Sequence, residues 1–236
     1  MSQPTVVLVH GAFAESASWN GVLTRLQAAG LTTVAVANPL RSLSTDAAHV
    51  RALLDAVEGP VVLVGHSYGG AVVSQAARGS RSVQALVFVA AFAPQEGESI
   101  AALSGRFPGS TLGETISPVP LPDGTTDLYI RQERYHQQFA ADVPAEQAAL
   151  LAATQRPLRD VALHEGAAPD PAWQHLPSWF LVPELDRNIP PQAQRFMAER
   201  AGAHEVVELD GASHALPASR PDDVADAVLR AAKATA

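Results

Sequence analysis

The stretch Val61-Val62-Leu63-Val64-Gly65-His66-Ser67-Tyr68-Gly69-Gly70 decides how the rest of this sequence can be interpreted. An apolar run typical of a buried strand leads directly into a Gly-X-Ser-X-Gly motif, and the apolar residues that follow suit a helix. The glycines at both ends of the motif permit the tight turn that joins a strand straight to a helix. The sequence therefore predicts a strand–turn–helix junction that holds the Ser67 hydroxyl above the end of a sheet.

A serine hydroxyl is a poor nucleophile near neutral pH and needs a base to take its proton. Among the eight histidines, His214 lies in the loop after the last predicted strand, where parallel sheets place their active sites. Asp186 follows the preceding strand, and a carboxylate there would hold the imidazole in the correct tautomer. Glu184 and Asp210 are the alternatives for this carboxylate. The candidate catalytic residues are Ser67, Asp186 and His214.

Acyl transfer also needs hydrogen-bond donors for the negative oxygen that develops on the substrate. One candidate is the backbone N–H of Tyr68, directly after the nucleophile. The second donor is expected in the loop His10-Gly11-Ala12-Phe13, where Ala12 is favoured and Phe13 is the alternative. Because both are backbone donors, these positions do not require polar side chains.

Short apolar runs bounded by Gly, Pro, Asn or Asp alternate with helix-like segments along the chain. Most of these runs lack strict polar alternation, which suits strands buried on both faces of a parallel sheet. The pattern predicts an α/β fold with a parallel, doubly wound sheet of about six strands and right-handed crossovers. The predicted strands are Thr5–Val9, Thr32–Ala37, Pro60–Val64, Val83–Ala90, Ser178–Val182 and His204–Leu209. The predicted helices are Trp19–Ala29, Asp46–Val57, Tyr68–Ala77, Pro191–Ala201 and Asp222–Ala232.

Three residues mark where predicted helices begin. Asp46 is expected to be the N-cap of its helix, because its carboxylate can accept hydrogen bonds from free backbone N–H groups. Pro191 and Pro221 suit first-turn positions, where the missing N–H of proline has no partner to lose.

The alternation of strands and helices breaks once, between residues 95 and 177. The first part, Gln95–Thr126, is rich in Gly, Pro and Ser and is predicted as loop, whereas Asp127–Thr154 is predicted as helical. Long loops without secondary structure are uncommon, so a partly helical cap insertion over the sheet edge is the better interpretation. The expected organisation is a core formed by residues 1–94 and 178–236, with a cap formed by residues 95–177.

Composition excludes several classes of function. The chain has 236 residues and no cysteine, which removes disulfides, cysteine-based zinc sites and thiol nucleophiles. With 16 basic against 24 acidic residues and no basic run, a nucleic-acid partner is not expected. No apolar stretch approaches the length of a membrane span, so we expect a cytoplasmic protein without a membrane partner. Metal-ligand and dinucleotide-binding motifs are absent from the sequence, so no metal or cofactor is expected.

The low content of charged residues, 17%, favours a neutral, apolar substrate. Four aromatic side chains are candidate walls of the substrate pocket, although each also suits core packing: Phe13, Phe92, Phe139 and Trp173. Exposed apolar surface on the cap would be compatible with a homodimer.

Several of these motifs together resemble the α/β-hydrolase superfamily, over the whole chain. They are Val7-Leu8-Val9-His10-Gly11-Ala12, the Gly65–Gly70 turn, the Asp186 loop and the His214 loop. Within the superfamily the chain is similar to the small capped esterases related to plant methylesterases and hydroxynitrile lyases. Its stretches Phe139–Glu146, Thr154–Pro157 and Pro177–Trp179 resemble bacterial members of that group.

The resemblance implies a cofactor-free serine hydrolase with the catalytic triad and oxyanion-hole residues named above. The leading hypothesis is hydrolysis of a small or medium, mostly apolar carboxylic ester or lactone through an acyl-enzyme intermediate. A lyase is the first alternative, but the lyase relatives typically carry a threonine in place of Gly11 and a lysine where this chain has Ala215. The second alternative is a ligand-binding receptor with little turnover, because a fold alone does not determine function.

Overall fold

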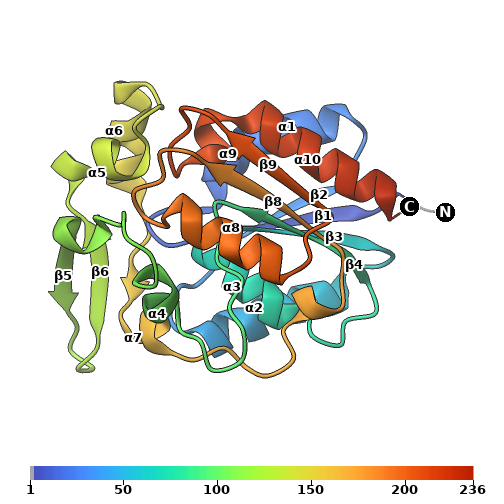
Figure 1. The fold of residues 1–236 in the computed structure, drawn as a ribbon, viewed down its shortest axis with the longest axis horizontal. Helices are drawn as coiled ribbons and strands as arrows, with labels where there is room; N and C mark the ends of the chain where they lie inside the picture. The colour runs from blue at the N-terminus through green and yellow to red at the C-terminus, as the bar shows by residue number, and fades with distance from the viewer. Residues whose placement is uncertain (1–2, 236) are drawn as a thin grey trace.

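The computed structural model describes residues 3–235 and is built around one parallel sheet (Figure 1). The six strands lie in the order β2-β1-β3-β4-β8-β9, and every neighbouring pair is parallel. They are β1 (Thr5–Val9), β2 (Thr33–Val36), β3 (Val61–His66), β4 (Val83–Val89), β8 (Ser178–Pro183) and β9 (Glu205–Leu209). The predicted parallel sheet of about six strands is confirmed.

Helices cover both faces of this sheet, which explains why its strands lack polar alternation. Val6 and Leu8 of β1 pack in one apolar cluster, and Val7 and Val9 pack in the cluster on the opposite face. The first cluster includes side chains of α1 (Asn20–Ala28) and α10 (Pro221–Ala234). The second includes side chains of α2 (Leu43–Ala56), α3 (Tyr68–Ala76) and α8 (Pro191–Arg200). The remaining core elements are η1 (Ser16–Trp19) and α9 (Leu216–Ser219).

The start of α2 differs from the prediction. Ser42, not Asp46, is the N-cap, because its hydroxyl accepts a hydrogen bond from the Thr45 N–H at 3.2 Å. Asp46 lies inside the first turn, where its buried carboxylate accepts the Arg41 N–H instead. Several polar residues precede this helix, so local composition did not identify which of them caps it. In α8 and α10 the predicted first-turn prolines are in place.

Residues 95–177, hereafter the cap segment, separate β4 from β8. The segment contains α4 (Ile100–Ser104), β5 (Ile116–Pro120), β6 (Thr126–Ile130), α5 (Gln132–Phe139), α6 (Ala145–Thr154), β7 (Leu158–Arg159), α7 (Val161–His164) and the single turns η2 (Leu112–Thr115) and η3 (Ala172–Gln174). Strands β5, β6 and β7 form a separate antiparallel sheet.

The loop prediction for Gln95–Thr126 is therefore wrong, since α4, η2 and β5 lie there. The helical prediction for Asp127–Thr154 holds for α5 and α6 but not for β6. The reason lies in β5, whose sequence Ile-Ser-Pro-Val-Pro has two prolines and no fully buried residue. Proline is tolerated on an edge strand such as β5 because one side of the strand needs no ladder donor. A strand of this kind lacks the apolar signal by which the core strands were identified.

The order of the strands locates a ligand-binding crevice. Because β2 lies on one side of β1 and β3 on the other, the chain diverges at the carboxyl ends of β1 and β3. Open α/β sheets bind ligands at such switch points. Figure 1 shows the cap-segment elements α5, α6, β5 and β6 beside that end of the sheet. Within residues 3–235, no helix combines the length and apolar character needed to cross a membrane.

Candidate active site

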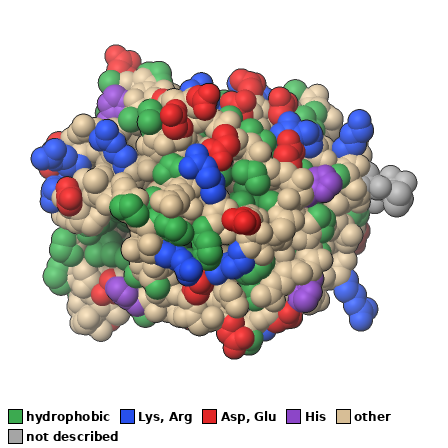
Figure 2. Space-filling model, in the orientation of Figure 1, with side chains coloured by type: hydrophobic (Ala, Val, Ile, Leu, Met, Phe, Trp, Pro, Cys, Tyr) green, Lys and Arg blue, Asp and Glu red, His purple; other side chains and the backbone are tan. Residues whose placement is uncertain are grey.

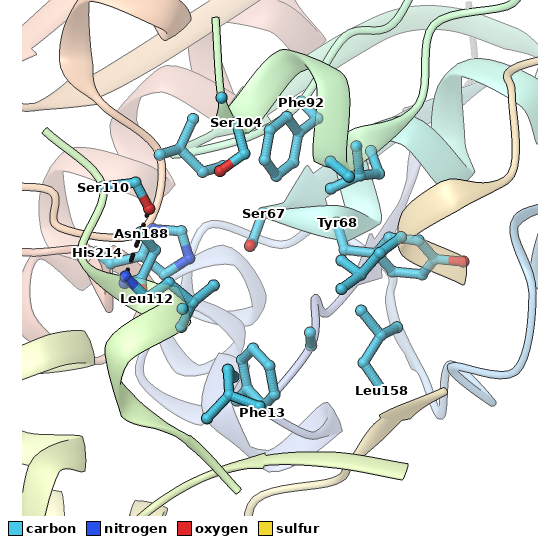
Figure 3. Close-up of a pocket in the computed structure, with 18 of the residues that line it drawn as sticks. Phe13, Ser67, Tyr68, Phe92, Ser104, Ser110, Leu112, Leu158, Asn188 and His214 are labelled. Carbon is cyan, nitrogen blue, oxygen red and sulfur yellow. Dashed lines mark hydrogen bonds between the residues drawn. The ribbon is translucent and has the colours of Figure 1, made fainter. Parts of the chain in front are cut away.

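Ser67 occupies a strained turn between β3 and α3. Its φ of 55° and ψ of −124° are rarely adopted by residues with a side chain and cost about 1–3 kcal/mol. Three backbone hydrogen bonds hold this geometry. The Ser67 N–H donates to the Val89 carbonyl at 3.1 Å, and the Ser67 carbonyl accepts the N–H groups of Phe92 at 3.1 Å and Gly70 at 3.0 Å. The side chain points into a cavity, as Figure 3 shows. The turn thus presents the hydroxyl at the switch point.

Close packing of this turn against β1 explains its glycines. A Cβ atom on Gly69 would lie 2.4 Å from the carbonyl oxygen of Val9, closer than real Cβ atoms come. Only glycine permits this approach, which brings the start of α3 next to the loop after β1.

His214 and Asp186 form a buried pair beside the cavity. Nδ1 of His214 lies 2.7 Å from Oδ2 of Asp186, and the two side chains are 1% and 0% exposed. Nε2 of His214 is also buried and has no hydrogen-bond partner among the described residues. His214 and Ser67 line the same cavity (Figure 3).

The Asp186 carboxylate accepts hydrogen bonds from every side. Oδ1 accepts the backbone N–H groups of Asn188 and Ile189 at 2.8 and 2.9 Å. Oδ2 accepts Nε2 of Gln194 at 2.8 Å, in addition to His214. These bonds fix which oxygen faces the imidazole. Gln194 was missed by the sequence analysis, because nothing in its neighbourhood within α8 indicates that it faces a loop before that helix.

The two alternative carboxylates lie elsewhere in the loops. Oε2 of Glu184 accepts the Gly211 N–H at 2.8 Å, so this side chain ties the two loops together. Asp210 is exposed, and its backbone carbonyl accepts a guanidinium N–H of Arg220 at 3.3 Å. Neither carboxylate contacts His214.

His66 contacts His214 through a hydrogen bond and through its ring. Its Nε2 lies 3.0 Å from the carbonyl oxygen of His214, and the two rings are 4.8 Å apart. Burial, reinforced by the neighbouring His214, lowers the pKa of His66 well below its usual value. His66 is therefore neutral, and its Nε2–H donates to the backbone carbonyl of His214.

The two candidates for the second oxyanion donor differ in their hydrogen bonds. The Phe13 N–H donates to the carbonyl oxygen of Arg156 at 3.0 Å, whereas the Ala12 N–H has no partner within the described residues. The Tyr68 N–H lies in the first turn of α3, where helix N–H groups are free and the helix dipole favours an anion. The Tyr68 side chain points away from Ser67 and donates to Oδ2 of Asp46 at 2.9 Å (Figure 3).

The cavity that these groups share has a volume of about 420 Å³. Its lining includes Phe13, Phe92 and Phe139 but not Trp173, whose indole N–H donates to Pro94 at 3.0 Å within the core. Further apolar walls, which the sequence analysis did not identify, are Ile100, Phe107, Leu112, Ile116, Leu158, Leu163 and Ile189. The residues that line it include no Asp, Glu, Lys or Arg.

Charges on the outer surface follow no single sign. On the face shown in Figure 2, acidic and basic side chains of the described residues are interspersed. Elsewhere on the described residues, Arg195 pairs with Glu208 at 2.5 Å and Arg200 pairs with Glu98 at 2.8 Å. This face carries no broad basic patch of the kind that binds nucleic acid.

An open parallel sheet, a serine on a strand-to-helix turn and a buried histidine–carboxylate pair define the class of α/β-hydrolases. The model of the Alpha/beta hydrolase family matches residues 6–227, and the chain belongs to this family. The predicted family and fold class are confirmed.

Curated relatives and solved structures cover nearly the whole chain. Esterase PIR7B of Oryza sativa subsp. japonica is 29% identical over 265 residues, spanning 98% of this chain and 96% of that protein. Salicylic acid-binding protein 2 of Nicotiana tabacum is 25% identical and spans 96% of each chain. The structure of polyneuridine aldehyde esterase matches with a TM-score of 0.82 at 19% identity, covering 97% and 99% of the two chains. The Arabidopsis methylesterase MES16 matches with a TM-score of 0.81 at 20% identity, covering 98% and 99%.

Proposed function

We propose that this protein hydrolyses a small or medium, neutral and mostly apolar carboxylic ester or lactone. The observation that carries the proposal is the buried His214–Asp186 pair at 2.7 Å, whose free Nε2 shares a cavity with Ser67. The esterase names of several relatives agree with the proposed reaction.

In the proposed mechanism, Oγ of Ser67 attacks the ester carbonyl carbon while its proton passes to Nε2 of His214. Asp186 orients the imidazole and stabilises the imidazolium that forms. The carbonyl oxygen becomes negative and accepts hydrogen bonds from the backbone N–H groups of Tyr68 and Ala12. The intermediate collapses as the alcohol leaves with the proton from His214. Water then attacks the acyl-enzyme, with His214 as the base, and releases the acid.

The lining of the cavity supports the proposed substrate class. A charged substrate would have to leave water for a cavity whose lining has no fixed opposite charge, which costs several kcal/mol. We further propose that residues 95–177 act as a cap, since α4 and η2 supply Ile100 and Leu112 to the cavity wall.

Two observations disfavour the lyase alternative. Ala215 stands where those relatives carry a lysine, and the cavity lining has no other cation to stabilise a leaving anion. Measuring catalytic turnover distinguishes the receptor alternative from the enzyme. One relative is named for binding salicylic acid, so slow or absent turnover with retained ligand binding would favour that alternative.

The test is a Ser67→Ala variant assayed with p-nitrophenyl esters of graded acyl length. Because the triad acts as a unit, we expect kcat to fall by about 10⁶-fold, leaving only the residual rate that the oxyanion donors and substrate binding supply. Ser178→Ala is a matched control, since the side-chain hydroxyl of this buried serine in β8 has no hydrogen-bond partner among the described residues. Stoichiometric labelling of the wild type, but not of Ser67→Ala, by a fluorophosphonate is the second readout. Full turnover by Ser67→Ala would refute the proposal.

A further inference from the structure

Phe13, in the loop after β1, has a strained backbone like that of Ser67. Its φ is 60°, in the left-handed region that residues with a side chain rarely adopt. Such a conformation is energetically unfavourable and persists only where the surroundings hold it. Phe13 directly follows Ala12, the proposed oxyanion donor. Whatever holds Phe13 therefore sets the direction of the neighbouring peptide groups.

Both backbone groups of Phe13 are held by the cap segment. Its N–H donates to the carbonyl oxygen of Arg156 at 3.0 Å. Its carbonyl oxygen accepts the hydroxyl of Tyr135 at 2.8 Å. Arg156 lies between α6 and β7, and Tyr135 lies on α5. The conformation of a core loop thus depends on two contacts from the cap segment.

The Tyr135 side chain is fixed in place. It is 1% exposed, and its ring stacks on Phe139 with centroids 4.9 Å apart. Phe139 in turn meets the His214 ring edge-on at 4.8 Å. Burial raises the pKa of Tyr135, so its hydroxyl stays protonated and remains a donor.

The Arg156 carbonyl is held with similar rigidity through its two neighbours. Gln155 bonds both backbone groups of Ile130, accepting its N–H and donating to its carbonyl, each at 2.9 Å. The Pro157 carbonyl accepts a guanidinium N–H of Arg41 at 2.8 Å. The peptide between them has little freedom to move away from Phe13.

We propose that Tyr135 is a positioning residue that, together with the Arg156 carbonyl, aims the Ala12 N–H at the oxyanion. The Phe13 N–H bond fixes the plane of the Ala12–Phe13 peptide, and the Tyr135 bond fixes the peptide after it. The Ala12 N–H belongs to the peptide just before these two, so anchoring them limits its movement, and Ala12 lines the cavity. The inference rests on the proposed function.

The first test compares Tyr135→Phe with Tyr129→Phe. The first substitution removes a single hydroxyl and leaves the Phe13 carbonyl buried without its donor. We expect kcat for a p-nitrophenyl ester to fall about tenfold, with KM changed less than about twofold, because the donor acts on the transition state. Tyr129 on β6 is half-buried, and its hydroxyl has no hydrogen bond within residues 3–235, so its variant should match the wild type.

A second readout separates positioning from general damage to the cavity. A trifluoromethyl ketone adds to Ser67: Oγ bonds the ketone carbon, the carbonyl electron pair moves onto oxygen, and the serine proton passes to His214. The matching methyl ketone binds largely without forming this oxyanion. Tyr135→Phe should weaken the trifluoromethyl ketone about tenfold and leave the methyl ketone unchanged. Equal weakening of both, or of neither, overturns the proposal.

A measurement on the unmodified protein does not depend on how well the variant folds. In amide hydrogen exchange, the Phe13 N–H should be protected in the free protein. The Ala12 N–H should exchange faster and become protected when the trifluoromethyl ketone binds. An Ala12 N–H that is unaffected by the ketone overturns the assignment. Failure of the proposed function is a separate result, since it appears as retained turnover in Ser67→Ala.

Discussion

Replacing Gly11 with alanine should disable the site while leaving the fold intact. A Cβ atom at this position would lie 2.6 Å from Cβ of Ser67, 2.7 Å from the His66 carbonyl oxygen and 3.1 Å from the Tyr68 nitrogen. Ordinary van der Waals contact begins at 3.4 Å, so the loop and the serine turn must separate by about 0.8 Å. The displaced atoms are the proposed nucleophile and an oxyanion donor.

The size of the effect follows from that displacement. A misplacement of about 1 Å at reacting groups costs on the order of 100-fold in rate, which corresponds to about 2.7 kcal/mol of transition-state stabilisation. Overpacking should also lower the free energy of unfolding, by about 1–3 kcal/mol. A threonine in place of Gly11, as in the lyase relatives, would require a wider separation between the two loops.

The assay is kcat/KM for a p-nitrophenyl ester, with urea unfolding measured in parallel. The control is Gly30→Ala, at the end of α1, where φ is +86° and a Cβ would meet nothing within 4 Å. This control should lose some stability through backbone strain but keep its turnover. If Gly11→Ala retains kcat/KM within about threefold of the wild type, the proposed packing of the oxyanion loop against Ser67 is refuted.

Two further predictions concern groups around the site. Burial lowers the pKa of His10 from 6.5 to about 4, so between these values the unfolded chain binds a proton that the folded protein does not; acidification from pH 6.5 to 4 should cost up to about 3 kcal/mol of stability. In the folded protein neutral His10 accepts the Asn38 N–H at 3.0 Å. In His10→Asn, the free energy of unfolding measured in urea should therefore depend less steeply on pH. An equal slope in the two proteins would contradict the assignment of this pH dependence to His10. Gln194→Met should lower kcat about tenfold with little change in KM, because Oδ2 of Asp186, the oxygen that faces His214, loses the donor that orients it. Unchanged kcat in steady-state assays would show that the remaining hydrogen bonds suffice.

The core fold could be predicted from sequence because its signals are local. Residues such as Val62 and Leu63 are buried on both faces of the sheet, so an apolar run marks the strand without any knowledge of its partners. The order of the candidate residues is likewise readable, since each of Ser67, Asp186 and His214 follows a strand and parallel strands end at one edge.

The cap segment was less predictable because its elements are stabilised by contacts with distant residues. Strand β5 is half-exposed and rich in proline, so its sequence has no apolar pattern that marks a strand. Hydrogen bonds with β6 hold it in the extended conformation. Trp173 was a candidate for the pocket wall because it is a large aromatic residue in the cap segment. Its indole N–H donates to the Pro94 carbonyl in the core, and the side chain does not line the cavity.

The sequence by itself determined the parallel sheet, the strained serine turn and the set of residues that meet at its carboxyl edge, because periodicity and glycine spacing act over a few neighbouring residues. Only the tertiary structure shows that the Phe13 N–H bonds the carbonyl oxygen of Arg156, far along the chain, whereas the Ala12 N–H has no partner among the described residues. It also brought Gln194 to Asp186 and Tyr135 to Phe13. Hydrogen bonds between distant segments exist only once the chain has folded, and they leave no periodic trace in the sequence.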